Sequence, residues 1–281
     1  MPAVSFDGLK VLSLESRRAV EMARLIETYG GRVISAPSMR EVPLAETDDI
    51  LFFARGLIAG QFDLVVFLTG VGVRALLQVL TEAQLAEAFL HALRRVKVAV
   101  RGPKPAAVLR EWKVPIAVSA PEPCTWRELL KVLVDSYDNI HSLRIVVQEY
   151  GVSNPDFLSA LRERGAMVKE VAVYRWELPE DTAPLRTAVA NLVSRQIDVA
   201  LFTTGVQAIH LFRVAEEMGQ QERLRSALKD VVIASIGPAT SETLQNLGVA
   251  VDLETTHPKM GVLVKEAAES APVLASHKRA N

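Results

Sequence analysis

The sequence predicts an α/β protein with two similar domains, each built on a parallel β-sheet. Three observations support this fold class. The chain contains a long internal repeat, apolar strand-like runs alternate with amphipathic helical segments, and a length of 281 residues suits about two domains. A duplicated set of loops on two domains implies a site built between them.

The two halves of the chain repeat each other at a fixed spacing. Residues 63–71 return as residues 198–206, and the two segments are 135 positions apart (198 − 63). The same offset relates Gly102-Pro103 to Gly237-Pro238. Two copies are too few for a solenoid, and each is too long for a propeller blade. The repeat therefore indicates an ancient gene duplication that gave two similar domains.

Six short runs of nearly continuous apolar residues are predicted to be strands. Such strands are buried on both faces, which is typical of a parallel sheet covered by helices. Amphipathic segments lie between them, and the resulting β-α-β-α order favours parallel sheets. The expected strands are residues 10–14, 64–68, 96–100, 143–148, 199–202 and 231–236, and the clearest helices are 18–29, 74–80, 155–164 and 239–247.

Two proline-bounded segments interrupt this alternation. Residues 36–44 and 171–179 are extended and occupy equivalent places in the two repeats, so we predict that they link the domains. The pattern leaves open whether each repeat folds as one contiguous domain or whether the first βα unit is exchanged between the repeats. The polar end of the chain, residues 271–281, contains Pro272 and is predicted to be a flexible tail.

Composition argues against several classes of function. With 32 basic and 33 acidic residues, the net charge of −1 provides no general attraction to nucleic acid or to an anionic membrane. Cys124 is the single cysteine, so neither an intrachain disulfide nor a thiolate metal cluster can form. No apolar run approaches the roughly 20 residues needed to cross a bilayer, and no signal-peptide pattern begins the sequence. The expected location is cytoplasmic.

Four turns at the predicted carboxyl ends of strands are candidates for binding an anion. Ligands of open parallel sheets bind at such ends, and each turn begins a helix whose free N–H groups and macrodipole favour negative charge. Every helix needs a cap, so one turn alone is weak evidence, whereas four equivalent turns favour a ligand site. The turns are Thr69-Gly70-Val71-Gly72, Thr204-Gly205-Val206, Gly102-Pro103-Lys104-Pro105 and Gly237-Pro238-Ala239-Thr240.

Basic side chains near these turns could hold a carboxylate. Arg17 and Arg18 follow the first predicted strand, and Arg101 ends another. Arg74 and Lys104 lie in the first turns of predicted helices, where a cation opposes the helix dipole. An anionic ligand would explain them, although long basic side chains also extend into solvent without any ligand.

A dinucleotide site is an alternative, because residues 70–75 match the pattern G-x-G-x-x-G/A after a strand. That fingerprint also needs an acidic residue at the end of the next strand, but here the next strand ends in Arg101. In the second repeat, Gln207 stands where the first has its second glycine. The histidines lack metal-ligand spacing, and neither a nucleophile elbow nor a Walker loop occurs. We therefore expect no metal and no cofactor.

Taken in order, these motifs resemble the uroporphyrinogen-III synthase family over about residues 8–270. The resemblance implies two flavodoxin-like domains joined by a two-stranded linker, with the active-site cleft between them and the first βα unit completing the C-terminal domain. The motifs are residues 16–19, 69–74, 101–104, 171–175, 197–206 and 235–240. The implied domains are 1–36 plus 178–270 and 43–171, with linker strands at 37–42 and 172–177.

The resemblance also implies an activity. The family converts hydroxymethylbilane, a linear tetrapyrrole with eight carboxylates, into uroporphyrinogen III by loss of water, ring closure and inversion of ring D. Departure of the hydroxyl gives an azafulvene, which the terminal ring attacks at its substituted carbon, and a spiro intermediate then fragments and recloses. For this reaction, assistance from a general acid matters less than holding the linear substrate in a curled conformation. The implied protein is a monomer of tetrapyrrole (haem) biosynthesis in transient contact with hydroxymethylbilane synthase.

Individual residues acquire expected roles from the same resemblance. Tyr174 matches the linker tyrosine of the family and is the candidate proton donor to the departing hydroxyl, since a phenol is protonated at neutral pH. The alternative is an aromatic side chain that only packs in the linker. Thr204 and Thr240 match carboxylate-binding hydroxyls, whereas Pro105 replaces a threonine of many members, for which Lys104 could substitute. The expected substrate-binding residues are Arg17, Arg18, Thr69, Gly70, Gly72, Arg74, Arg101, Gly102, Lys104, Thr204, Gly205, Val206, Gly237, Pro238 and Thr240.

Two other functions are compatible with the same sequence features. A non-catalytic two-domain sensor of small molecules would use the same fold and the same loops. A dinucleotide-binding enzyme would instead require the glycines at 70 and 72 to contact a pyrophosphate.

Overall fold

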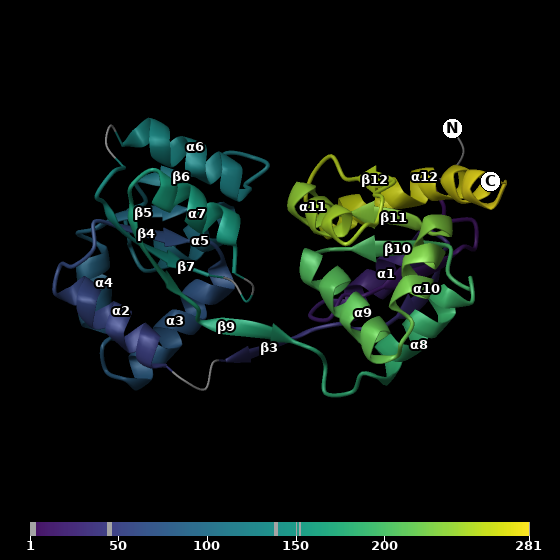
Figure 1. Cartoon of the computed structure of the whole chain (residues 1–281), viewed down its shortest axis with the longest axis horizontal. Helices are drawn as coiled ribbons and strands as arrows, with labels where there is room; N and C mark the ends of the chain where they lie inside the picture. Colours follow the sequence, from purple (N-terminus) through teal and green to yellow (C-terminus); the bar gives the residue numbers. More distant parts are fainter. Residues whose placement is uncertain (1–3, 44–46, 138–139, 150, 152, 281) are drawn as a thin grey trace. The chain divides into compact units, whose positions relative to one another are not determined.

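The computed structural model describes residues 4–43, 47–137, 140–149, 151 and 153–280. The chain forms two compact units, unit 1 from Met1–Arg40 with Glu177–Asn281 and unit 2 from Glu41–Trp176. Each unit contains a five-stranded parallel sheet, and a two-stranded antiparallel sheet joins the segments that connect them (Figure 1). The α/β class predicted from the sequence is confirmed.

Unit 1 has the strand order β12-β11-β10-β1-β2. Numbered along the chain within the unit, this is the order 5-4-3-1-2 of a flavodoxin-like sheet, which changes direction of winding between β1 and β10. Its elements are β1 (Lys10–Ser13), α1 (Ala19–Thr28), β2 (Arg32–Ser35), α8 (Ala183–Val193), β10 (Val199–Phe202), α9 (Gly205–Glu217), α10 (Gln221–Ala227), the 3-10 turn η1 (Leu228–Asp230), β11 (Val232–Ser235), α11 (Pro238–Asn246), β12 (Leu253–Glu254) and α12 (Met260–Ala280).

Unit 2 has the matching order β6-β5-β4-β7-β8, so that β4 and β7 take the places of β10 and β1. Phe67 of β4 lies opposite Val100 on one side and Gln148 on the other. The elements of this unit are α2 (Asp48–Ile58), β4 (Leu64–Phe67), α3 (Gly70–Glu82), α4 (Ala86–Leu93), β5 (Lys97–Val100), α5 (Pro103–Glu111), β6 (Val118–Ser119), α6 (Trp126–Ser136), β7 (Arg144–Gln148), α7 (Pro155–Glu163) and β8 (Met167–Val171).

The two repeats exchange their first βα units. At the 135-residue offset, β10 corresponds to β4, β11 to β5, and β1 with β2 to β7 with β8. However, β1 pairs with β10 from the other half of the chain, as β7 pairs with β4. The connecting strands are β3 (Arg40–Pro43) and β9 (Tyr174–Glu177), and the chain passes between the units within them.

Both sheets are covered by helices on two faces, as continuous apolar strands require. In β10, Ala200 and Phe202 pack into a core with residues of α8 and α9, whereas Val199 and Leu201 pack with residues of α1 and α12. In unit 2, residues of α2 to α5 contribute to the core on one face and residues of α6 and α7 to the core on the other (Figure 1). The alternation follows from the two-residue period of a strand.

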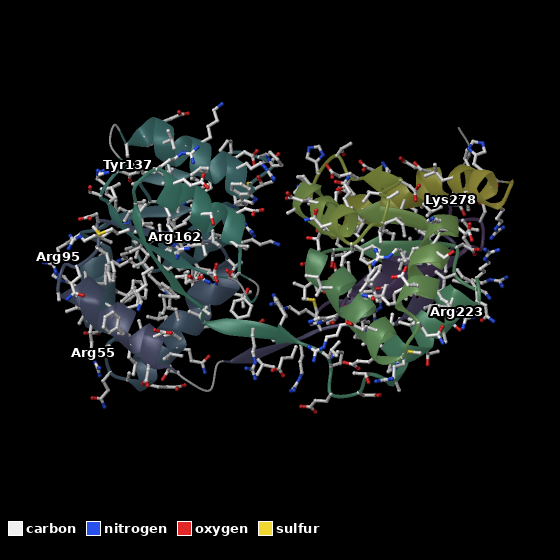
Figure 2. All side chains as sticks on the ribbon, in the orientation of Figure 1. Arg55, Arg95, Tyr137, Arg162, Arg223 and Lys278 are labelled. Carbon is white, nitrogen blue, oxygen red and sulfur yellow. The ribbon has the colours of Figure 1, made fainter. Side chains whose placement is uncertain are left out.

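The end of the chain differs from the sequence prediction of a flexible tail at 271–281. Helix α12 continues through this region, and the last residue of the chain lies outside the described part. Ala271 and Ala275 are buried, and Lys278 Nζ lies 2.7 Å from Asp252 Oδ2 (Figure 2 labels Lys278). Burial of one helix face therefore outweighs the polar composition on which the prediction was based.

The described helices include none that is long and apolar enough to span a membrane. Likewise, no group of three or more histidine, cysteine, aspartate or glutamate side chains in the described residues is arranged to hold a metal ion.

Candidate functional site

The four turns identified in the sequence are helix starts at the carboxyl ends of central strands. In unit 1, α9 follows β10 and α11 follows β11, and in unit 2, α3 follows β4 and α5 follows β5. The first N–H groups of each helix have no partner within that helix, and the dipole places partial positive charge there. Each unit thus has two helix ends suited to a carboxylate.

Glycine at the start of α9 and of α3 lets a second helix approach closely. A Cβ on Gly205 would lie 2.7 Å from the Cβ of Thr243 in α11. A Cβ on Gly70 would lie 2.8 Å from the carbonyl oxygen of Lys104 in α5. Contacts this short do not occur between real side chains, so both positions require glycine. In unit 2, therefore, two helix N-termini lie next to each other, whereas in unit 1 the start of α9 lies against the second turn of α11.

Two threonine hydroxyls in unit 1 are available to a ligand. Thr204 is the N-cap of α9, but its side chain makes no capping hydrogen bond. Thr240 lies in the first turn of α11 and is 5% exposed. Neither hydroxyl has a hydrogen-bond partner among the residues that the structure describes. Both could donate to a carboxylate bound at these helix ends.

A glutamate that sequence reasoning missed lies at the same edge of unit 1. Glu15 follows β1, and its Oε2 accepts a hydrogen bond from Thr203 Oγ1 at 2.6 Å. The buried Gln207 accepts from the N–H of Thr203 at 2.8 Å and donates to its hydroxyl at 2.9 Å. Hydrogen bonds from Thr203 to Glu15, after β1, and to Gln207, in α9, thus fix the turn before α9. A contact across 188 sequence positions leaves no local signal in the sequence.

The corresponding turn of unit 2 brings two predicted site residues together. Thr69 caps α3 by accepting from the N–H of Gly72 at 3.0 Å. Its Oγ1 lies 3.3 Å from the hydroxyl of Tyr174 in β9. Tyr174 is only 3% exposed and packs edge-on against Trp176, with ring centroids 5.4 Å apart. The candidate proton donor and a candidate binding hydroxyl therefore form one pair.

The basic residues predicted for the site differ in their surroundings. Arg74 binds both carboxylate oxygens of Glu111 in α5, at 2.8 and 2.9 Å, and Arg18 is paired with Glu21. These partners account for the two arginines without an anionic ligand. Lys104 is exposed, and no described residue hydrogen-bonds or pairs with its side chain. Of the three, Lys104 is the one best placed to meet an anionic ligand. Arg17 is exposed after β1, and Arg101 is half-buried after β5.

A second missed glutamate, Glu149, directly follows β7 and is 6% exposed. Burial raises the pKa of Glu149, while hydrogen bonds from the Asn154 N–H at 3.2 Å and the Ser153 hydroxyl at 3.1 Å act in the opposite direction. Because the folded state holds this proton more tightly than the unfolded state, the group favours folding at low pH, and that contribution is lost as the pH rises through the raised pKa.

The glycines that suggested a dinucleotide site have packing explanations. Gly70 allows α5 to approach closely, as described above. Gly72 leaves space for the side chain of Gln148, whose Cδ would lie 2.6 Å from a Cβ at position 72. Neither glycine needs a pyrophosphate to account for it. The structure gives no support to the nucleotide alternative.

Comparison with known proteins agrees with these features. A family model for uroporphyrinogen-III synthase HemD matches residues 20–265. The chain belongs to this family. A protein of Methanothermobacter thermautotrophicus, whose name gives uroporphyrinogen-III synthase as a candidate activity, is 30% identical over 233 residues, which cover 83% of this chain and 87% of the relative.

The chain is also similar to a second sequence relative and to a solved structure. The uncharacterized protein YjjA of Bacillus subtilis is 28% identical over 266 residues, which cover 93% of this chain and 96% of that protein. The crystal structure of a mutant uroporphyrinogen III synthase from the extremely thermophilic bacterium Thermus thermophilus matches with a TM-score of 0.72 and 24% identity, covering 96% of this chain and all of that one (100%). This match confirms the predicted fold.

Proposed function

We propose that this member of the family is a uroporphyrinogen-III synthase, which closes hydroxymethylbilane with loss of water and inversion of ring D. The observation that carries the proposal is the presence of two helix N-termini at the carboxyl edge of each sheet, with the unpartnered hydroxyls of Thr204 and Thr240 beside them among the described residues of unit 1. A substrate with eight carboxylates needs many N–H and O–H donors. A chain of net charge −1 must supply them locally.

Substrate binding in this proposal uses the turns of each unit. In unit 1, the two threonine hydroxyls and the first N–H groups of α9 and α11 bind carboxylates. In unit 2, the start of α5 and the ammonium of Lys104 do so. The larger part of catalysis is positional, because the linear tetrapyrrole must be held curled for the substituted carbon of ring D to be attacked.

Proton transfer is assigned to Tyr174. Its hydroxyl gives a proton to the departing hydroxyl of the substrate, the C–O bond breaks, and water leaves while the pyrrole nitrogen takes up the positive charge as an azafulvenium. Thr69, whose Oγ1 lies 3.3 Å from the phenol, donates a hydrogen bond to the phenolate so formed. The proton released when the closed ring regains its aromaticity restores the phenol, so the reaction balances without a cofactor.

The experiment that tests this function resolves the isomers of the product. The purified protein is incubated with freshly generated hydroxymethylbilane, and the products are oxidised and separated by chromatography. We expect isomer III, in an amount that rises with protein concentration, whereas heat-inactivated protein should give the isomer I of simple closure. Isomer I alone at every protein concentration would exclude the activity.

Replacing Tyr174 by phenylalanine is expected to lower kcat by a modest factor, about 10-fold or less. General acids typically contribute about 10²–10⁴-fold, but this leaving group departs readily, so less assistance is needed. Steady-state kinetics measures the effect. Tyr137→Phe, the same change at the end of α6, is the matched control and should leave kcat unchanged. An unaltered kcat in Tyr174→Phe would remove this residue from the mechanism.

A further inference from the structure

In unit 2, a buried glutamine on the neighbouring strand packs against the first turn of α3. Gln148 is the last residue of β7, pairs with Phe67 of β4 and is 0% exposed. Its amide lies over the first turn of α3, because a Cβ on Gly72 would lie 2.6 Å from Cδ and 2.8 Å from Oε1 of Gln148. Its Nε2 donates to the carbonyl of Glu149. While Gln148 occupies this place, only glycine fits at position 72.

Unit 1 also combines a glutamine with a small residue at these two places, but on exchanged elements. The 135-residue offset of the repeat aligns Gly72 with Gln207 and Gln148 with Ser13. In unit 1 the glutamine therefore lies on the helix and the small residue on the strand. Gln207 is 1% exposed and makes hydrogen bonds with both the N–H and the hydroxyl of Thr203. Each unit thus places one buried glutamine amide at the helix start where the winding of its sheet reverses, which is the ligand-binding place of such sheets.

Stability alone does not account for the amide in unit 2. Gln148 Oε1 is buried, and it has no hydrogen-bond partner among the described residues. A buried acceptor without a donor is unfavourable, and an apolar side chain of similar length would avoid that cost. Polar groups that weaken a core without compensation are expected at functional sites. The observation therefore indicates that the amide does something other than stabilise the fold.

We propose that Gln148 is a positioning residue of the site. Its side chain, anchored by the Nε2 bond to the Glu149 carbonyl, packs from the strand side against the first turn of α3. The anchored amide thereby fixes that turn and with it Thr69, whose hydroxyl caps the turn and contacts Tyr174. Gln207 does the same for the equivalent turn of unit 1 from the helix side. Gln148 does not touch the substrate in this proposal, and its catalytic consequence rests on the proposed function.

The first test is Gln148→Met, which keeps the length of the side chain and removes the amide. We expect an unchanged or slightly raised Tm, about 10-fold lower kcat/KM for hydroxymethylbilane, and at least 10-fold faster amide hydrogen exchange at Gly72 and Val73, which both donate to Thr69. A residue that only fills space would be replaced by methionine without consequence, with kcat/KM and exchange rates equal to those of the parent, and that result would overturn the proposal. Gln78→Met, at an exposed position of α3, is the control and should change none of these quantities.

The second test rebuilds the arrangement of unit 1 in unit 2. Gly72→Gln alone should lose nearly all activity, because its side chain collides with Gln148. Adding Gln148→Ser, the residue type at the equivalent strand position, should restore kcat/KM to within about 3-fold of the parent. A double variant no more active and no better folded than Gly72→Gln would contradict the proposal.

Failure of the proposed function can be told apart from failure of this inference. If the parent protein makes no isomer III, the synthase activity is rejected, yet the exchange rates at Gly72 and Val73 in Gln148→Met still report whether the glutamine holds the turn. Exchange rates equal to those of the parent would overturn the inference whatever the activity.

Discussion

A chain that ends at Ser270 is expected to lose about 3 kcal/mol or more of its free energy of unfolding. The removed segment carries Ala271 and Ala275, which are buried against the sheet of unit 1. It also carries Lys278, whose side chain is 18% exposed and pairs with Asp252, itself 17% exposed, at 2.7 Å. Removing one partner leaves a mostly buried carboxylate without its counter-charge, which is strongly destabilising. Urea unfolding followed by circular dichroism measures the loss.

Two single variants separate the causes and remain informative if the shortened chain does not fold. Lys278→Met keeps the helix but removes the ion pair, and it should account for much of the loss. Arg279→Ala removes a guanidinium that is 62% exposed from Asp198, which is 18% exposed and keeps its hydrogen bond from the Lys10 N–H, so we expect a smaller loss than in Lys278→Met. A chain ending at Ser270 that is as stable as the full chain would show that this segment is a dispensable tail.

The double replacement Thr204→Val and Thr240→Val is expected to lower kcat/KM about 100-fold or more. Valine keeps the shape of threonine and removes only the hydroxyl. A hydrogen bond to a charged group contributes about 1.5–3 kcal/mol, and two such bonds to substrate carboxylates are lost together. Because both bonds form in the bound substrate as well as in the transition state, most of the effect should appear in KM. Steady-state kinetics with hydroxymethylbilane provides the measurement.

The fold should tolerate this double variant, since the Thr204 side chain makes no capping bond and neither hydroxyl has a partner among the described residues. Thr28→Val is the matched control. Its hydroxyl is exposed at the end of α1 and donates to the carbonyl of Arg24, so kcat and KM should not change. A KM in the double variant equal to that of the parent would show that these hydroxyls do not bind the substrate.

Much of the architecture and the four candidate turns could be predicted from the sequence, because they depend on local properties. The expected strand at 64–68 is β4 (Leu64–Phe67), since a continuous apolar run is recognisable without knowing its neighbours. The turns at Gly70 and Gly205 were recognisable because glycine marks a helix start that another chain segment approaches closely. The repeat showed in addition that these features occur twice.

The contacts that assemble the candidate site were decided by the tertiary structure alone. Glu15 meets Thr203, and Gln148 meets Gly72, because the sheet places the ends of β1 beside β10 and of β7 beside β4. Nothing near these residues in the sequence indicates the partner.

The sequence by itself determined six of the strands, four of the helices and the four turns at which central strands lead into helices. It did not determine which sheet each strand joins, since an apolar run is equally suited to either sheet. That choice, the exchange of the first βα units and the helical end of the chain follow from side-chain packing between distant segments. The physical reason is that the free energy gained by burying apolar side chains depends on both segments that pack together. Which segments those are is decided only when the chain folds.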